Sequence, residues 1–193
     1  MQIRNLAENT EDFTGNAWLM ESSETVLIDT GTGDSWENIS ELEKVDKVVI
    51  THSHYDHVDN LPKVKDAYSP EIYAFEPDNL PVAAEKLGEQ DEITLCGSNF
   101  QVFHTPGHKD DSICLYSEEQ KILFTGDLVF PEGGFGRTDL EEGDRELLIE
   151  SIKKLVGLDV KEMYCGHGPA SLENVEKQIE KSLEEAEKHE SKY

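Results

Sequence analysis

A run of six residues contains three histidines and one aspartate, in the order His52-Ser-His54-Tyr-Asp56-His57. It comes directly after Lys47–Ile50, a short apolar run that predicts a buried strand. Alternate residues of an extended chain point the same way, so His52 and His54 can reach one metal ion. Asp56 and His57 can reach a second ion once the chain has turned. Imidazole and carboxylate groups together suit Zn²⁺ and similar metals.

Three further candidate ligands lie in loops farther along the chain. His108, Asp127 and His167 each follow a glycine, and the last two come just after apolar, strand-like runs. Glycine lets the backbone turn sharply where ligands must converge. We therefore expect these loops to meet the first motif at one metal site. The alternative is that the histidine cluster is a polar loop or a pH-sensing group.

Apolar runs and loops alternate along the whole chain, which predicts a single domain over residues 1–193. We expect strands at residues 16–20, 25–28, 47–50, 71–75, 92–96, 100–103, 112–116, 121–124 and 160–165. These strands form two groups, and segments with helical spacing follow each group. The pattern predicts a sandwich of two sheets with helices on the outside.

Capping and helix-breaking residues locate several of the expected helices. Pro62 is expected to interrupt a helix after the histidine motif. Asp144 is expected to cap a helix that buries five residues: Leu147, Leu148, Ser151, Ile152 and Leu155. Ser171 is expected to begin a terminal helix that buries Leu172.

The chain is strongly acidic, with 42 acidic side chains, 17 lysines and arginines and a formal net charge of −25. Such a surface repels phosphate backbones and anionic lipids, so we expect neither nucleic acid nor a membrane as a partner. No apolar leader, long apolar segment or paired set of cysteines is visible, which predicts a reduced cytoplasmic protein. The acidity fits either a high-salt cytosol or an ordinary acidic protein.

Four motifs resemble, in the same order, those of the metallo-β-lactamase-fold hydrolases: Thr51-His-Ser-His-Tyr-Asp-His57, His104-Thr-Pro-Gly-His108, Thr125-Gly-Asp127 and Gly166-His-Gly-Pro169. They are most similar to those of the small glyoxalase II-like branch, and the resemblance covers about residues 16–169. It implies an α/β (α+β) fold, a four-layer αβ/βα sandwich of two mixed β-sheets flanked by helices. The metals of that fold lie at one edge, between the sheets.

The resemblance also implies a site for two metal ions. It assigns three histidines to one ion, and one aspartate with two histidines to the other: His52, His54 and His108, then Asp56, His57 and His167. Asp127 would bridge both ions. Zinc is expected first, with iron or manganese as alternatives, because nitrogen and oxygen ligands discriminate weakly among these metals. Asp29 is expected either to orient a ligand or to cap its own turn, Arg137 to form an ion pair or reach substrate, and Phe135 to be a mobile pocket wall.

The implied activity is hydrolysis of a small-molecule thioester or related acyl compound, as in hydroxyacyl-thioester hydrolases. A metal-bridging hydroxide would attack the acyl carbon, with Asp56 as the catalytic residue that holds the hydroxide's proton. Of the 193 residues only 26 follow His167. That is too few for the helical domain that helps bind glutathione in glyoxalase II, which favours a minimal-scaffold thioesterase or a general acyl hydrolase over a glutathione-thioester hydrolase.

Other activities use similar ligand sets. A mononuclear-iron persulfide dioxygenase is the main alternative, and a lactonase or β-lactamase-type hydrolase is another. A metal-binding regulatory module is the alternative outside enzymes. The sequence does not indicate the oligomeric state.

Overall fold

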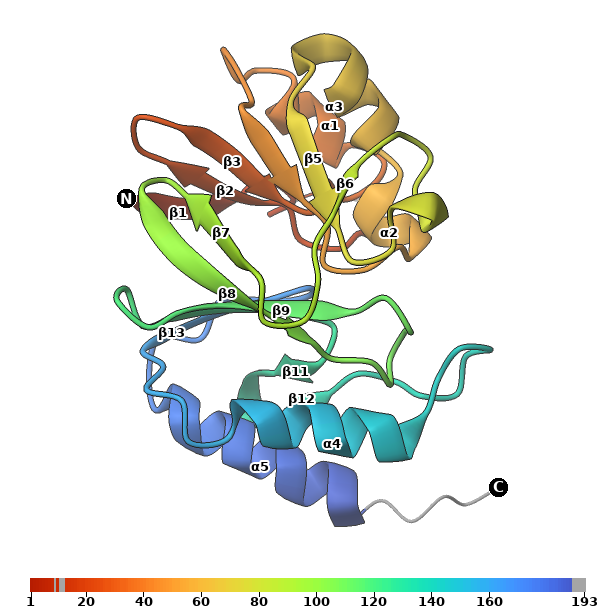
Figure 1. Ribbon diagram of the computed structural model, residues 1–193, viewed down its shortest axis with the longest axis vertical. Helices are drawn as coiled ribbons and strands as arrows, with labels where there is room; N and C mark the ends of the chain where they lie inside the picture. The colour runs from red at the N-terminus through yellow and green to blue at the C-terminus, as the bar shows by residue number, and fades with distance from the viewer. Residues whose placement is uncertain (9, 11–12, 189–193) are drawn as a thin grey trace.

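The computed structural model describes residues 1–8, 10 and 13–188, and its framework is two mixed β-sheets packed face to face (Figure 1). The first sheet has its strands in chain order: β1 (Gln2–Asn5), β2 (Trp18–Glu21), β3 (Thr25–Ile28), β4 (Lys47–Val49), β5 (Glu71–Ala74) and β6 (Glu85–Lys86). The second has the order β13-β10-β9-β8-β7: β7 (Glu92–Leu95), β8 (Ser98–His104), β9 (Ile113–Ser117), β10 (Ile122–Gly126) and β13 (Glu162–Cys165). A small hairpin joins β11 (Val129–Phe130) to β12 (Gly134–Phe135).

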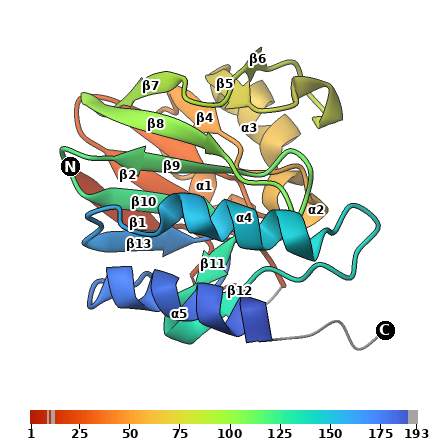
Figure 2. The same ribbon diagram turned by 60° about the horizontal axis from the view of Figure 1, so that its bottom comes forward.

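Helices cover the outer face of each sheet (Figure 1 and Figure 2). The first sheet carries α1 (Ser35–Ile39), α2 (Tyr55–Val58) and α3 (Leu61–Tyr68), and the second carries α4 (Arg145–Leu155) and α5 (Val175–Lys188). Two 3-10 turns, η1 (Pro77–Asn79) and η2 (Pro131–Gly133), lie in loops. This arrangement confirms the predicted sandwich with helices outside. In the part of the chain that the structure describes, no helix has the length and apolar character needed to cross a membrane.

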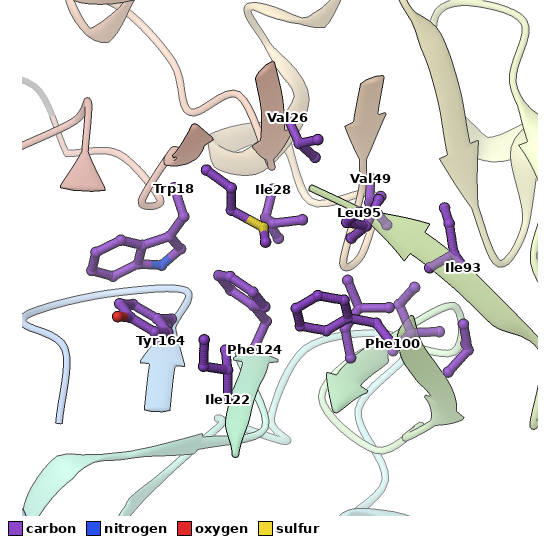
Figure 3. Packing of buried hydrophobic residues seen from close by; sticks show 14 of the residues in the cluster. Trp18, Val26, Ile28, Val49, Ile93, Leu95, Phe100, Ile122, Phe124 and Tyr164 are labelled. Carbon is purple, nitrogen blue, oxygen red and sulfur yellow. The ribbon is translucent and has the colours of Figure 1, made fainter. Parts of the chain in front are cut away.

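The central apolar layer lies between the two sheets (Figure 3). Phe100 and Phe124 are fully buried there, with their ring centroids 6.0 Å apart. Trp18 packs edge-on against Tyr164 at 5.0 Å and so joins β2 of one sheet to β13 of the other. Because strand residues alternate in direction, each sheet also buries its other face under its helices.

Strand direction determines where the loops with polar motifs emerge. β3 and β4 are parallel, so their carboxyl ends lie together. β9 is antiparallel to both β8 and β10, and β13 is parallel to β10. The carboxyl ends of β8, β10 and β13 therefore also share one edge. Backbone hydrogen bonds join the two edges, from Ile113 to Thr51 (2.8 Å) and from Asn16 to Gly166 (2.6 Å).

Three of the helix predictions need correction. Pro62 does not break a helix but lies in the first turn of α3, where its missing N–H is not needed. Leu147 is 43% exposed, because α4 buries Leu148. Leu172 is 62% exposed and precedes α5, because Ser171 pairs with Met163 in a β-bridge that keeps the chain extended there.

The central layer predicts a large stability difference between two apolar truncations. Phe100→Ala should lower the free energy of unfolding by about 3–5 kcal/mol, because it leaves a cavity between the sheets. Leu172→Ala, at an exposed position, should change it by no more than about 0.5 kcal/mol. Urea unfolding followed by circular dichroism measures both. Equal losses would contradict the assignment of Phe100 to the core.

Candidate metal centre

The structure brings all seven predicted ligands together where the loops of the two sheets meet. They follow β4 (His52 and His54), lie in α2 (Asp56 and His57), or follow β8 (His108), β10 (Asp127) and β13 (His167). Three groups have ligand atoms within 4.8 Å of one another: His52, His54 and His108; His52, His57 and Asp127; Asp56, His57 and His167. The first and third groups are the two triads that the family resemblance implies, and the second group joins them.

Asp127 lies between the two triads. Its Oδ2 is 3.5 Å from Nε2 of His108 in the first triad and 3.4 Å from Nε2 of His167 in the other. Its Oδ1 is 3.5 Å from Nε2 of His57. One carboxylate therefore faces imidazole nitrogens of both triads, which is the position that a ligand shared by two metal ions needs.

Hydrogen bonds orient three of the imidazole rings. Nδ1 of His57 is 2.8 Å from Oδ2 of Asp29, and Nδ1 of His108 is 2.9 Å from the backbone carbonyl of Arg137. Nδ1 of His52 is 3.2 Å from the hydroxyl of Thr51. When each ring donates from Nδ1, its Nε2 lone pair faces the centre, as in known metal-bound histidines.

Asp29 connects the end of β3 to the histidine motif that follows β4. Its carboxylate accepts hydrogen bonds from the backbone N–H and the hydroxyl of Thr51, both at 2.7 Å, in addition to the one from His57. Its backbone is left-handed, with φ 60°, a conformation uncommon for residues other than glycine. Asp29 therefore contacts His57, one of the predicted ligands.

Buried polar atoms without partners test whether the residues fit a metal. Nε2 of His52, Nε2 of His57 and Oδ1 of Asp127 are buried and make no hydrogen bond with any of the residues that the structure describes. Buried polar atoms are normally paired, because an unpaired one loses its hydration without compensation. Nδ1 of His54 also lies 2.9 Å from Nε2 of His108. Converging acceptor atoms of this kind fit divalent metal ions, and together with the fold they support metal binding.

The charges at the centre favour a cation. Burial, together with neighbouring imidazoles, holds the pKa of His52 well below its usual value. Burial opposes ionisation of Asp56, but His167 and His57 outweigh it and lower the Asp56 pKa to about 2. Burial also opposes charge on His167, yet Asp127 and Asp56 raise its pKa to about 10. In the metal-free protein a proton on His167 thus supplies part of the positive charge that a metal would bring.

Close approach at the centre requires glycine at two positions. A Cβ on Gly166 would lie 2.0 Å from Oδ1 of Asp127, and a Cβ on Gly15 would lie 2.8 Å from Nε2 of His57. Gly15 also donates a backbone hydrogen bond to Asp56 (3.0 Å), and the Asn16 side chain donates to the carbonyl of Gly168 (2.8 Å). We call residues 13–16 the N-terminal strap, because they tie the segment of Asp56 and His57 to the loop of His167.

A cavity of about 900 Å³ opens onto the centre. Apolar side chains from several separate segments line it: Phe13, Tyr55, Phe130, Pro131, Leu140 and Pro169. Sequence reasoning did not identify Phe13 or Tyr55 as lining residues. Tyr55 could have been found, because it lies between the ligands His54 and Asp56. No local signal marks Phe13, which reaches the site only through the fold.

Two predicted substrate contacts have different outcomes. Phe135 does not line the cavity, which corrects its assignment as a pocket wall. It pairs with Val129 in the β11–β12 hairpin and packs against the apolar layer under α4 and α5. Arg137 does line the cavity, and its guanidinium forms two hydrogen bonds with Asp139, at 2.7 and 2.8 Å.

Comparisons with known proteins agree with this geometry. A family model described as the metallo-beta-lactamase superfamily matches residues 10–167. The hydroxyacylglutathione hydrolase GloC of Haemophilus influenzae is 34% identical over 169 residues, which are 74% of this chain and 79% of that protein. The atrochrysone carboxyl ACP thioesterase of Aspergillus fumigatus is 28% identical over 87% of this chain, which spans only 54% of that protein.

A solved structure resembles the chain over almost its whole length. The crystal structure of the BLEG-1 B3 metallo-beta-lactamase has a TM-score of 0.76 and 26% identity, and the match covers 95% of this chain and 97% of that one. Together with the match to the family model, this confirms the fold that the motifs implied.

The contacts of Asp29 predict a loss of metal affinity when its charge is removed. Asp29→Asn should weaken metal binding by about 10- to 100-fold, because the His57 ring loses the carboxylate that orients it. Titration with a chromophoric chelator measures the affinity. Asp159→Asn, which changes a surface ion pair, is the matched control and should bind metal normally. Equal affinities of the two variants would contradict the role of Asp29.

Metal removal should destabilise the protein in a pH-dependent manner. A ligand that binds the folded state raises the unfolding temperature, so chelation should lower it and added Zn²⁺ should restore it. Because the pKa of His167 is raised in the folded protein, its bound proton stabilises the metal-free fold. This contribution is complete below pH 6.5 and is lost as the pH rises toward about 10. The stabilisation by metal should therefore grow from pH 6 to pH 8.

Thermal scans of one sample with and without EDTA at each pH provide the measurement. An unfolding temperature that is unchanged after all metal has been removed would contradict a metal site at this centre. A metal effect that shrinks as the pH rises would contradict competition between protons and metal.

Proposed function

The chain belongs to the metallo-beta-lactamase superfamily and, within it, to the glyoxalase II-like branch of metal-dependent hydrolases. On that premise we propose that it hydrolyses thioesters at a site for two divalent metal ions, most favourably zinc. The observation that carries this proposal is the position of Asp127, whose two oxygens face imidazoles of both triads. A site for one ion would not need a carboxylate shared in this way.

The reaction adds water across the acyl–sulfur bond. The water oxygen forms a bond to the acyl carbon, the carbon–sulfur bond breaks, and the sulfur leaves as a thiolate that takes up a proton. When bound, the two metal ions supply Lewis acidity toward the carbonyl oxygen and lower the pKa of water at the site. His52, His54 and His108 would hold one ion, and Asp56, His57 and His167 the other.

The side chains have distinct roles in this proposal. Asp56 lines the cavity, and its Oδ2 is 3.1 Å from Nε2 of His167. As a carboxylate it accepts a hydrogen bond from the attacking water and so directs the water's lone pair toward the acyl carbon. Asp29, through His57, and the carbonyl of Arg137, through His108, keep the rings from turning.

The names of the relatives support a thioester as substrate. One is called a hydroxyacylglutathione hydrolase and another an atrochrysone carboxyl ACP thioesterase. The cavity that opens onto Asp56 and His167 has the size of a site for a small molecule. These observations point to a small acyl thioester as substrate.

The proposal predicts metal-dependent cleavage of simple thioesters. Protein purified without chelators should contain about two zinc ions per chain, as the two triads require. It should release thiol from acetyl-N-acetylcysteamine, detected with a thiol reagent. Asp127→Ala should lose both metal and activity, by at least about 100-fold in kcat/KM. Asp66→Ala, at an exposed position of α3, is the control and should retain both.

Other metal contents and activities would contradict the proposal. One iron per chain, with oxygen uptake in the presence of glutathione persulfide, would indicate a dioxygenase instead. Full activity of Asp127→Ala would exclude a shared ligand.

A second candidate activity is hydrolysis of β-lactams. The likeness to the BLEG-1 enzyme favours it, because the match covers almost the whole length of both chains. Cleavage of an amide in a strained ring needs the same attacking water and the same charge stabilisation. A chromogenic cephalosporin included in the thioester assay tests it, and a larger kcat/KM for the cephalosporin would favour this candidate.

A further inference from the structure

We propose that the site selects thioesters whose acyl group is apolar and whose thiol carries no net charge, with Phe13 as a specificity-determining residue. This inference rests on the proposed thioester hydrolysis. Three independent features of the cavity support it. Its walls are apolar and exposed, its described lining has no lysine or arginine without an ion-pair partner, and the residues next to Phe13 are hydrogen-bonded to the site.

The cavity concentrates the exposed apolar side chains of the protein. The described residues include seven large apolar side chains that are exposed, and three of them line this cavity: Phe13, Tyr55 and Leu140. Phe13 is 81% exposed and Tyr55 68%. Exposed apolar groups gathered in one place mark binding surfaces, because their burial by a ligand is favourable.

Phe13 lies directly beside the reacting centre. Its ring stacks on the imidazole of His167, with centroids 5.2 Å apart and an angle of 22° between the planes. Phe130 also lies near His167, at 6.4 Å. An acyl chain held with its carbonyl at the metal centre therefore meets aromatic rings next to the bond that breaks.

The position of Phe13 is fixed by the N-terminal strap. Gly15 and Asn16 donate backbone hydrogen bonds to Asp56 (3.0 Å) and Gly166 (2.6 Å). The hydroxyl of Thr14 accepts one from the backbone of Thr32, at 2.8 Å. These bonds hold the residues next to Phe13 against the segment of Asp56 and against the loop of His167. The exposed ring of Phe13 therefore stays beside the place where a substrate would bind.

The charges around the cavity disfavour an anionic thiol. Asp56 and Asp127 belong to the metal site, which leaves Glu132 and Arg137 as the other charged residues in the described lining. The guanidinium of Arg137 is already paired with Asp139 through two hydrogen bonds. The chain as a whole carries a net charge of −25. The glutathione part of a thioester has two carboxylates and one ammonium group, so it carries a net negative charge. The described lining offers its carboxylates no unpaired lysine or arginine, and the negative charge of the protein repels it.

A pair of substrate series tests both parts of the proposal with the metal-loaded protein. The first series varies the acyl group on neutral N-acetylcysteamine: acetyl, butyryl, phenylacetyl and succinyl. The second compares phenylacetyl thioesters of N-acetylcysteamine and glutathione. We expect kcat/KM to be at least about tenfold higher for phenylacetyl than for acetyl, and for butyryl than for succinyl. Moderate salt should speed the glutathione thioester but not the neutral one.

Variants of Phe13 connect the preference to the structure. Phe13→Ala should lower the phenylacetyl-to-acetyl ratio of kcat/KM by about tenfold, and Phe13→Leu by less. A ratio measured within one enzyme is independent of metal loading and of the folded fraction. Leu172→Ala removes an exposed apolar side chain outside this cavity, and it should leave the ratio unchanged.

The outcomes separate this inference from the proposed function. If no thioester is cleaved, the proposed function fails, and this inference fails with it. If thioesters are cleaved but the ratio is near one, or Phe13→Ala leaves it unchanged, only the present inference is overturned. A higher kcat/KM for the glutathione thioester than for its neutral counterpart would also overturn only the present inference.

Discussion

Seven side chains that carry metal-ligating groups share one small volume, and a positive charge among them is favourable there. Their nitrogen and oxygen lone pairs face one another across a few ångströms, and Oδ1 of Asp127 and Nε2 of His52 and His57 make no hydrogen bond with any described residue. In a metal-free protein a proton on His167 supplies part of that charge. Much of the surrounding structure can be understood as the means of holding these groups together.

The sandwich supplies a frame in which neither sheet alone makes the site. The first sheet provides Asp29 and the histidine motif, and the second provides His108, Asp127 and His167. The apolar layer between the sheets, with Phe100 and Phe124 at its centre, sets their separation. Stability and function are therefore linked, because a change in that layer moves one half of the site against the other.

The substrate side of the site has a different origin. Its walls come from the strap, from α2, from the β11–β12 hairpin and from loops, not from the two large sheets, and they place aromatic rings beside the candidate metal centre. The same metal ligands can then serve different substrates, because the loops decide what fits against them. The chain is similar both to a protein named hydroxyacylglutathione hydrolase and to one named metallo-beta-lactamase, so proteins with different named activities share this fold.

The sequence by itself determined the two sheets, the outer helices and the identity of the seven clustered residues. Strand periodicity is local, and the seven residues follow from motifs whose order resembles that of a known family, so both can be read without coordinates. Only the tertiary structure decided that Leu147 and Leu172 face solvent, that Phe135 packs under the helices, and that Phe13 covers His167. Those outcomes depend on contacts between distant segments, as between residues 13 and 167. No local pattern records which of several apolar side chains such contacts will bury and which will remain at the site.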